Sequence, residues 1–349
     1  MQFREVPVEG WKKIVHVEDE QTGLNAIISV HDATLGPGCG GVRMFPYANF
    51  DAALEDAKNL SRGMSYKNAL GGIPFGGGKS VIIADPKTDK SDALFKAFGR
   101  ALNELKGLYY TAQDSGISDA DLAKIGAATK YVGGIGSNGV GGNPGPFTAR
   151  GVWRGMQAAA RHHFKVDSLK GQRVCILGVG SVGMSLAKLL HEEGAILTVA
   201  DVNDSATAIA ARDFGATIVS PDEAPGQAVD IYAPCALGGA INDGTIDQLK
   251  AKIVAGAANN QLKTPEMGLA LKVRGILYAP DFVINAAGVI SVGLEILGKW
   301  TNEEMVRRID DIGVTLTELF QRSSKEGRDT AEVADEMAIE VINRGKRAA

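Results

Sequence analysis

The sequence lacks the features that mark membrane proteins and nucleic-acid-binding proteins. Its 349 residues contain no apolar run of about 18 residues, the length that spans a bilayer, and the start MQFREVPVEGWKK has no apolar run of signal-peptide length. Basic residues are not in surplus, because the formal net charge is −4 at pH 7. We therefore expect a cytoplasmic protein that binds neither nucleic acid nor a membrane.

Cysteine and histidine are scarce and unsuitably spaced for metal or disulfide chemistry. Cys39, Cys175 and Cys235 are odd in number, widely separated, and include no C-x-x-C pair. This spacing argues against a disulfide framework and against a thiolate metal site. The five histidines form no H-E-x-x-H motif and no pair four residues apart. We therefore expect no bound metal, and core or surface positions for the histidines.

Glycine, in contrast, is abundant. The chain has 44 glycines among 349 residues, about one in eight, whereas the average is roughly 7%. The glycines cluster in segments that we interpret as loops able to approach a ligand closely. The length is about twice that of a typical domain, which predicts two domains.

The first part of the chain mixes strand and helix patterns. Two β-rich runs, 12–17 and 24–30, are separated by the polar turn EDEQTG and predict an antiparallel hairpin. Helical patterns follow, with one strand-like segment between them. The sequence then reaches YVGGIGSNGVGGNPGPFT at 131–148, which cannot hold a regular element, and we place a domain hinge there. The expected helices are 49–63 and 91–106, and the expected strand is 80–84.

Beyond this hinge, short apolar strands alternate with helices. Such alternation predicts a parallel sheet with right-handed crossover connections. The last fifty residues are charged and have a helical pattern. The expected helices are 148–163, 181–193 and 204–213, and the expected strands are 172–177, 196–200, 216–219, 230–232, 252–255 and 275–278.

A dinucleotide-binding motif opens this second part. Strand QRVCIL leads directly into Gly178-Val179-Gly180-Ser181-Val182-Gly183 and then into a helix. A bare G-x-G-x-x-G is weak support in a glycine-rich chain, but a strand before it and a helix after it make it informative. The first glycine permits a tight turn, and the second lets the backbone approach a pyrophosphate. The third lets the helix pack on the strand, with its N-terminal N–H groups aimed at the phosphates.

Asp201 ends the next strand, 18 residues after Gly183. A carboxylate there accepts hydrogen bonds from ribose hydroxyls and repels a 2′-phosphate. No Arg or Lys follows it in VNDSAT, so we expect NAD and not NADP. A helix cap or turn Asp in a fold that binds no cofactor is the alternative.

These patterns place the chain in the α/β class with two domains separated by a cleft. We expect a Rossmann-type NAD-binding domain over 136–325. The remainder, 1–135 and 326–349, is expected to form an α/β substrate and catalytic domain that also carries the oligomer contacts.

The segment GGIPFGGGKS at 71–80 invites interpretation as a phosphate-binding P-loop. That motif requires a glycine five residues before the glycine of GK, where this chain has Ile73. Pro74 also removes one N–H donor. The spacing therefore excludes a nucleotide triphosphatase of this type.

Three charged residues remain as candidates for acid–base chemistry. Lys79 follows three glycines and precedes an apolar strand, and Lys67 lies among small residues in SRGMSYKNA. Two ammonium groups in one cleft cannot both ionise cheaply, so desolvation and repulsion would lower one pKa and create a general base. Asp114, in YYTAQDSG, could supply a carboxyl partner. Each of the three alone is equally compatible with a structural role.

The segment LGGIPFGGGKSVIIADP at 70–86 resembles the signature of the glutamate, leucine, phenylalanine and valine dehydrogenase family. The resemblance extends nearly from end to end, and the chain is short, like the leucine and phenylalanine members. The other matching segments are LGPGCGGVR (35–43), LSRGMSYKNA (60–69), TAQDSG (111–116), GNPGPFTARGV (142–152), APCALGG (233–239), VAGAANNQL (254–262) and GILYAPDFVINAAGVI (275–290).

The resemblance implies a role for each matching residue. Lys79 is similar to the catalytic lysine of the family, and Asp114 to its proton-shuttling aspartate. Lys67, Gly40 and Gly41 resemble the groups that meet the substrate carboxylate. Met64 and Asn260 are further expected substrate contacts, and whether Asn259 or Asn260 faces the substrate stays open. The expected cofactor-side residues are Thr148, Gly178, Gly180, Ser181, Val182, Gly183, Asp201, Val202, Cys235, Ala236, Ala258, Asn260 and Asn285.

The reaction that the resemblance implies is NAD-dependent oxidative deamination of an L-amino acid to a 2-oxo acid and ammonia, which is reversible. Neutral Lys79 would help to deprotonate the attacking water, and Asp114 would move protons to and from the amine. A homo-oligomer is expected. A non-catalytic NAD-binding regulator on the same fold is the alternative of a different class, and such a protein should have lost some of the three charged residues.

The substrate side chain is the least constrained prediction. Ala112, Val289 and Val292 match the alanine and valines of leucine dehydrogenases, which shape a branched aliphatic pocket. Cys39 replaces a larger residue and would enlarge that pocket, and VGLEILGKW (292–300) is similar to a phenylalanine dehydrogenase. We favour leucine, valine and isoleucine, with phenylalanine as the alternative. A methylene group is worth only roughly 1–3 kcal/mol in such a pocket, so overlapping substrates are expected.

Overall fold

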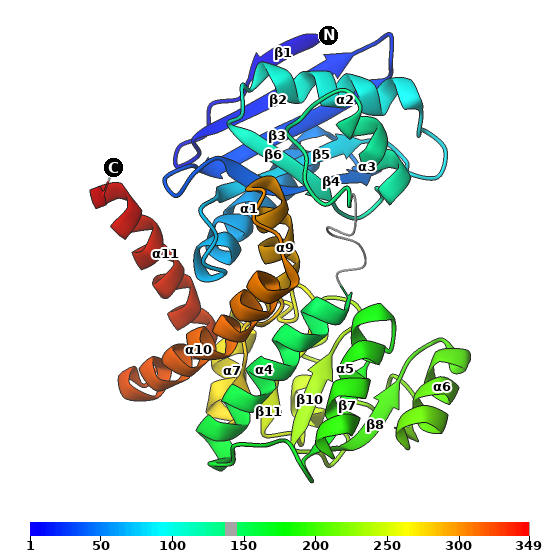
Figure 1. Cartoon of the computed structure of the whole chain (residues 1–349), viewed down its shortest axis with the longest axis vertical. Helices are drawn as coiled ribbons and strands as arrows, with labels where there is room; N and C mark the ends of the chain where they lie inside the picture. Colours follow the sequence, from blue (N-terminus) through cyan, green and yellow to red (C-terminus); the bar gives the residue numbers. More distant parts are fainter. Residues whose placement is uncertain (137–144, 349) are drawn as a thin grey trace. The chain divides into compact units, whose positions relative to one another are not determined.

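Two six-stranded sheets organise the computed structural model, which describes residues 1–136 and 145–348. The described chain divides into two compact units (Figure 1). Unit 1 comprises residues 1–142, 289–302 and 338–349, and unit 2 comprises 143–288 and 303–337. The predicted α/β class with two domains is confirmed.

The sheet of unit 1 has the strand order β1-β2-β3-β5-β4-β6. The predicted hairpin is confirmed as β2 and β3, which pair antiparallel, and β4 pairs parallel to both β5 and β6. The elements of this part of the chain are β1 (Gln2–Glu5), β2 (Lys13–Asp19), β3 (Leu24–Asp32), β4 (Gly38–Phe45), α1 (Phe50–Leu70), β5 (Gly76–Ile83), α2 (Asp92–Glu104), β6 (Tyr109–Gln113) and α3 (Asp119–Gly126).

Helix α1 covers one face of this sheet, and α2 and α3 cover the other. Small α1 residues pack with strand residues such as Val81, whereas Phe95 and Phe98 of α2 join a separate core cluster on the opposite face. The buried stripe of α1 consists of small or polar residues: Ala53, Ala57, Ser61, Ser65, Asn68 and Ala69. An apolar pattern therefore predicts only its first part, and the helix extends to Leu70 instead of ending near residue 63.

The close approach of α1 explains why Gly77, the middle one of three glycines in β5, has no side chain. A Cβ on Gly77 would stand 2.3 Å from the Ser65 backbone nitrogen and 2.4 Å from the Ser61 carbonyl oxygen. The interpretation of these glycines as a loop was wrong, because Gly76–Gly78 lie in β5 and Gly40–Gly41 lie in β4. Glycine is normally depleted in strands, and here helix packing requires it.

Unit 2 contains a wholly parallel sheet with the strand order β12-β11-β10-β7-β8-β9. Numbered from β7, this is the order 6-5-4-1-2-3 of a doubly wound dinucleotide-binding fold, with its switch point between β7 and β10. The elements of this part are α4 (Gly145–Phe164), β7 (Arg173–Leu177), α5 (Ser181–Glu193), β8 (Ile196–Ala200), α6 (Asp204–Phe214), β9 (Thr217–Ile218), β10 (Ile231–Pro234), η1 (Ile246–Gln248), β11 (Ile253–Val254), α7 (Glu266–Val273), β12 (Leu277–Tyr278), α8 (Asp281–Ile284) and α10 (Asn302–Glu326).

The compact units differ from the predicted domain bounds in the C-terminal part of the chain. Residues 289–302 group with unit 1, and residues 326–337 group with unit 2. Two of these boundaries fall inside continuous helices, α9 (Ala287–Ile296) and α11 (Thr330–Ala348), whereas the sequence pattern suggested boundaries in loops. The predicted hinge at 131–148 lies partly outside the described residues, and helix α4 begins at Gly145.

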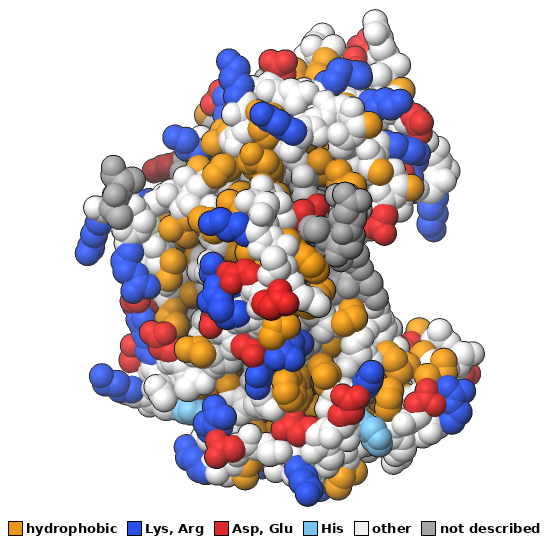
Figure 2. Space-filling model, in the orientation of Figure 1, with side chains coloured by type: hydrophobic (Ala, Val, Ile, Leu, Met, Phe, Trp, Pro, Cys, Tyr) orange, Lys and Arg blue, Asp and Glu red, His pale blue; other side chains and the backbone are white. Residues whose placement is uncertain are grey.

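The surface of each unit carries charges of both signs. Figure 2 shows Lys and Arg side chains interspersed with Asp and Glu side chains over the visible face. Among the described residues, no helix is both long enough and apolar enough to cross a membrane.

Candidate active site

Lys79, which is buried, and Asp114, which is half-buried, form an ion pair in unit 1. The Nζ atom of Lys79 lies 2.7 Å from Oδ2 of Asp114, and the exposed fractions of the two side chains are 7% and 23%. Lys79 is a central residue of β5, paired with Ser29 of β3, and Asp114 directly follows the last residue of β6. Two residues that are 35 positions apart are thereby held in direct contact.

Burial and neighbouring charges lower the pKa values of both groups, which suits acid–base chemistry. Burial lowers the pKa of Lys79, and Arg43 lowers it further, while Asp114 partly opposes the shift. Burial acts to raise the pKa of Asp114, but the charges of Lys79 and Arg43 outweigh it and hold this pKa below its usual value. Asp114 is therefore a carboxylate at neutral pH, and Lys79 loses its proton more readily than an exposed lysine.

Gly41 has no side chain and therefore leaves room for the side chain of Asp114. It lies on β4, between β5 and β6, and is paired with Ala112. A Cβ at Gly41 would stand 2.8 Å from the Cβ of Asp114 and 2.6 Å from the carbonyl oxygen of Gln113. Any larger residue would therefore displace the carboxylate.

Helix α1 brings further predicted residues to the same strands. The Met64 side chain lies 3.0 Å from the position that a Cβ on Gly40 would occupy. Lys67 is half-buried in the last turn of α1 and follows Met64 by three residues, which places both on one face of the helix. The expected effect of Lys67 on Lys79 is not among the main causes of the Lys79 pKa shift, in which burial comes first.

The four residues predicted to shape the side-chain pocket all belong to unit 1. Cys39 and Ala112 are buried on β4 and β6, at 2% and 7% exposure. Val289 and Val292 lie on the part of α9 that groups with unit 1, not with the Rossmann unit as their sequence position suggested. Val292 packs beside Gly133 and Gly134, the segment that follows the β-bridge to Thr111.

Arg43 is a site residue that the sequence analysis missed. Its Nε donates a hydrogen bond to Oδ2 of Asp114 at 3.0 Å, and its Nη1 donates to Oδ2 of Asp56 at 3.0 Å. The Tyr47 hydroxyl also donates to Oδ2 of Asp56. Arg43 stands at the end of the LGPGCGGVR motif, so its position in a matching segment was the available signal.

In unit 2 the predicted dinucleotide turn has the expected form. Gly178 follows β7 with φ +98°, and its backbone approaches Ala236 beyond β10, at the switch point of the sheet. A Cβ on Gly183 would meet the Gly178 carbonyl oxygen at 1.9 Å, so the helix can pack on the turn only with glycine there. A Cβ on Gly180 would meet nothing within 4 Å. Packing within the protein therefore requires Gly178 and Gly183 but leaves open space at Gly180.

Asp201 lies directly beyond β8 and is bound to the glycine turn. Its Oδ2 accepts a hydrogen bond from the Val179 N–H at 2.7 Å, and its Oδ1 accepts from the Asn203 N–H at 2.9 Å. A carboxylate oxygen can accept more than one hydrogen bond, so both retain capacity for ribose hydroxyls. Val202, the next residue, is 92% exposed.

The other predicted cofactor residues lie on the loops beyond the same strands or on α4. Asn285 donates to the Ala257 carbonyl oxygen and to Oδ1 of Asn259, while its own buried Oδ1 has no hydrogen-bond partner. Asn260 is exposed and adopts φ +51°. Burial raises the pKa of Cys235 to about 12, so its thiol is neutral. Ala258 is buried, Ser181 begins α5 with Val182 after it, and Thr148 is a half-buried residue of α4.

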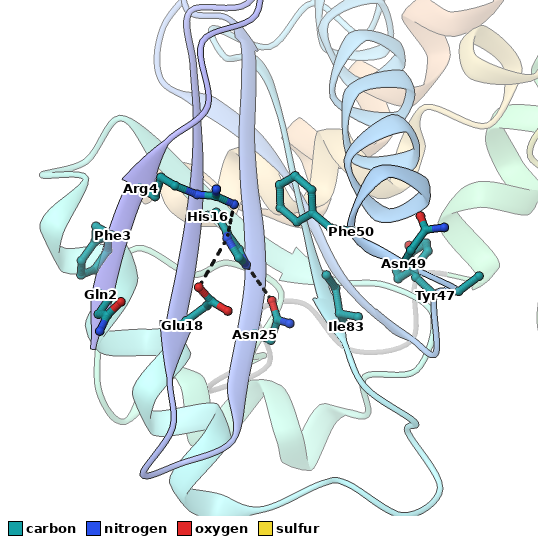
Figure 3. A pocket seen from close by; sticks show the side chains of 11 residues that line it. Gln2, Phe3, Arg4, His16, Glu18, Asn25, Tyr47, Asn49, Phe50 and Ile83 are labelled. Atoms are coloured by element: carbon teal, nitrogen blue, oxygen red, sulfur yellow. Dashed lines mark hydrogen bonds and ion pairs between the residues drawn. The ribbon is translucent and has the colours of Figure 1, made fainter.

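One cavity lies elsewhere on the unit 1 sheet, and neither Lys79 nor Asp114 lines it. It has a volume of about 570 Å³ and is lined by residues of β1, β2 and β3 and by the segment 47–50 (Figure 3). His16 in its wall accepts a hydrogen bond from Arg4 at Nδ1 and bonds Asn25 through Nε2 at 2.8 Å. These bonds give His16 a structural role, as expected from the sequence.

Known proteins resemble this chain over almost its whole length. Residues 12–131 match the family model "Glu/Leu/Phe/Val dehydrogenase, dimerisation domain", and residues 206–348 match "Glutamate/Leucine/Phenylalanine/Valine dehydrogenase". The leucine dehydrogenase of Bacillus subtilis is 48% identical, covering 99% of this chain and 95% of that protein. The phenylalanine dehydrogenase of Bacillus thermotolerans is 42% identical, covering 96% and 90%.

A solved structure agrees with both units. The crystal structure of L-tryptophan dehydrogenase from Nostoc punctiforme has a TM-score of 0.88 and 41% sequence identity, covering 97% of each chain. Both matching family models describe the same dehydrogenase family, and the similar proteins cover almost the whole chain. The chain belongs to the Glu/Leu/Phe/Val dehydrogenase family.

Proposed function

We propose that this protein is an NAD-dependent dehydrogenase that oxidatively deaminates branched-chain L-amino acids to 2-oxo acids and ammonia. The observation that carries the proposal is the buried contact between Lys79 Nζ and Asp114 Oδ2. A non-catalytic regulator has no need of such a pair, which costs desolvation free energy to bury. Family membership supports an amino-acid dehydrogenase, and the cofactor and substrate are the finer parts of the proposal.

The residues of unit 1 provide the acid–base steps. The amino acid loses a hydride from Cα, and its amine becomes an iminium. Lys79, in its neutral form, accepts a proton from the water that attacks this carbon, and Asp114 carries protons to and from the departing amine. Ammonia leaves as the carbonyl forms. Lys67 and the backbone of Gly40 and Gly41 are assigned to the substrate carboxylate, for which an ammonium and N–H donors are suitable partners.

The glycine turn of unit 2 fits a dinucleotide. The open space at Gly180 and the uncapped start of α5 leave N–H groups available to a pyrophosphate. The remaining acceptor capacity of Asp201 suits ribose hydroxyls, and its charge disfavours a 2′-phosphate. The bound NAD would supply the hydride acceptor. The unpaired Asn285 Oδ1 marks a buried polar atom on this side that lacks a partner within the protein.

Branched-chain preference rests on the residues around α9 and on the relatives. Val292 and Ala112 give the expected pocket an aliphatic lining, and the relative named leucine dehydrogenase has higher identity to this chain than those named for aromatic amino acids. Cys39, a small residue beside Gly40, is the feature that favours an aromatic side chain.

The test is formation of NADH, followed at 340 nm, with each L-amino acid at alkaline pH. We expect kcat/KM to be higher for L-leucine, L-valine and L-isoleucine than for L-phenylalanine, with NAD preferred over NADP, and ammonia released in a 1:1 ratio to NADH. A large excess for phenylalanine would reverse the substrate assignment. Absence of turnover with every neutral amino acid would refute the activity itself.

We further propose a homo-oligomer formed through unit 1. The family model matched by residues 12–131 is described as a dimerisation domain. Strand β1 is at the end of its sheet and pairs only with β2, which leaves an edge that a second copy can cover. Analytical ultracentrifugation is the test, and a monomer at micromolar concentration would contradict this proposal.

A further inference from the structure

Asp114 is held by more than its contact with Lys79. The Arg43 guanidinium spans two carboxylates through different nitrogens, with Nε on Asp114 and Nη1 on Asp56, each at 3.0 Å. The Tyr47 hydroxyl reaches the same Asp56 oxygen at 2.5 Å. The result is a continuous chain of contacts from Tyr47 through Asp56 and Arg43 to Asp114 and Lys79.

The members of this chain of contacts come from β4, from α1 and from the segment that joins them. Arg43 is a residue of β4, Asp56 lies in the second turn of α1, and Tyr47 lies between these two elements. The exposed fractions of the Arg43 and Asp56 side chains are 25% and 30%, so both are partly shielded from water. Ion pairs in such positions retain more of their Coulomb energy than fully exposed pairs.

We propose that Arg43, positioned by Asp56 and Tyr47, fixes the Asp114 carboxylate against Lys79 and sets the pH at which the pair becomes catalytically competent. This inference rests on the proposed function, because it concerns the same acid–base pair. Arg43 and Asp56 act as positioning residues: they reach the reaction only through Asp114 and Lys79.

The charges of Arg43 and Asp56 shift the pKa of Lys79 in opposite directions. Arg43 lowers the pKa of Lys79, although burial is the larger cause, and Asp56 acts to raise it. Arg43 also helps to lower the pKa of Asp114 against the effect of burial. Removing the positive charge of residue 43 should therefore raise both pKa values, and removing the negative charge of residue 56 should lower that of Lys79.

Other titratable groups lie on the elements that neighbour β5 and β6. His31 of β3 bonds the Ser65 hydroxyl on α1 at 2.8 Å, and burial lowers its pKa, which keeps it neutral at alkaline pH. Tyr109 lies beneath β5, and burial raises its pKa. Neither group changes charge as the pH rises from neutral to moderately alkaline, so neither would account for a rise in activity over that range. The remaining titratable residues on the last turns of α1 are Tyr66 and Lys67.

The experiment compares the pH profiles of Arg43→Gln and Asp56→Asn. Activity requires neutral Lys79, so kcat/KM for oxidative deamination should rise with pH through the Lys79 pKa. We expect Arg43→Gln to move this rise to higher pH by about 1 unit, which is roughly a tenfold loss of kcat/KM below the midpoint. Asp56→Asn should move it to lower pH, by about half a unit.

Two further variants separate charge from geometry. Arg43→Lys keeps the charge but cannot donate to both carboxylates from fixed positions, because the three N–H groups of an ammonium share one nitrogen atom. Compared with Arg43→Gln, this variant should bring the midpoint of the pH profile back to that of the unmodified protein but should recover only part of kcat. Glu55→Gln is the matched control, since Glu55 adjoins Asp56 on α1 but pairs with Lys58, and it should change neither quantity.

A second readout makes the test independent of catalysis. The rate at which acetic anhydride acetylates Lys79, quantified by peptide mass spectrometry across pH, follows the fraction of neutral amine. The midpoints should shift in the same opposite directions for Arg43→Gln and Asp56→Asn. Asp56→Asn preserves the shape of the side chain, so it keeps the test available if Arg43→Gln fails to fold.

The outcomes distinguish the two proposals. Opposite shifts in the acetylation profile support the positioning role, whether or not any amino acid is oxidised. Unchanged midpoints, or shifts in the same direction for both variants, would overturn it even in an active enzyme. Absence of NADH formation by the unmodified protein with every amino acid would refute the proposed function instead.

Discussion

Gly77 in unit 1 and Gly180 in unit 2 serve opposite purposes. In β5 of unit 1, a Cβ on Gly77 would collide with backbone atoms of α1, so glycine allows a helix to lie close against the strand that carries Lys79. In the turn after β7 of unit 2, a Cβ on Gly180 would meet only open space. The first glycine is required by the fold itself, and the second leaves room that we assign to a cofactor. The same residue type thus lets a helix pack beside the proposed catalytic lysine in one unit and leaves room for the proposed cofactor in the other.

The largest effect is expected for a substitution in unit 1, at a proposed catalytic residue. Asp114→Asn removes a charge and one proton-carrying group but preserves the shape of the side chain. We expect turnover to fall by about 10²- to 10⁴-fold, with NAD affinity unchanged, since NAD is assigned to unit 2. Steady-state kinetics and calorimetric NAD titration measure both quantities. Asp119→Asn, at an exposed position of α3, is the control; similar losses in both variants would remove Asp114 from the mechanism.

The next prediction concerns the glycine that the fold requires. Gly77→Ala should destabilise the protein by roughly 1–3 kcal/mol, because the methyl group forces α1 away from the sheet. Denaturant unfolding monitored by circular dichroism gives this free energy. Gly63→Ala on α1, where a Cβ would meet nothing within 4 Å, should be neutral or stabilising. Equal stability of the Gly77→Ala variant would show that the close packing of α1 is not needed.

The counterpart in unit 2 should affect binding and not stability. Gly180→Ala places a methyl group where the pyrophosphate is proposed to lie, so the Kd for NAD should rise about tenfold, equivalent to roughly 1.4 kcal/mol. The free energy of unfolding should stay unchanged, because no protein atom is displaced. Unaltered NAD affinity would contradict the assignment of this turn to the cofactor.

The smallest effect is expected at Asp201. Asp201→Ser removes the charge that would repel a 2′-phosphate, and the ratio of kcat/KM for NADP to that for NAD should rise several-fold, by about 1 kcal/mol. Asp204→Ser, at the exposed start of α6, provides a matched substitution. If NADP is already preferred by the unmodified protein, the assignment of NAD is wrong.

The sequence predicts unit 2 better than unit 1 for a physical reason. The spacing of Gly178, Gly180 and Gly183 between a strand and a helix corresponds to one known geometry, and Asp201 follows at the usual distance. Short-range patterns of this kind can be read along the chain. The parallel sheet and the sequence of strand, glycine turn and helix are accordingly confirmed by the structure.

In unit 1 the decisive contacts join residues far apart in the sequence. Arg43, Asp56 and Asp114 meet across 71 positions, and no local pattern signals such a contact. The glycines of β5 were interpreted as a loop, because glycine rarely occupies strands and because the contacts that require them, with α1 at Gly77 and with Tyr109 at Gly78, join residues distant in the sequence. Because the buried residues of α1 are small or polar, the sequence pattern indicates neither the length of this helix nor its packing on the sheet. Val289 and Val292 were likewise assigned to the wrong unit, because the boundary lies within a continuous helix.

We propose that Lys79 performs the acid–base step while unit 2 binds the cofactor, and one variant tests this division most directly. Lys79→Ala should reduce NADH formation from L-leucine by about 10³-fold or more, while NAD binds with unchanged affinity in the same preparation. Turnover close to that of the unmodified protein would contradict the account.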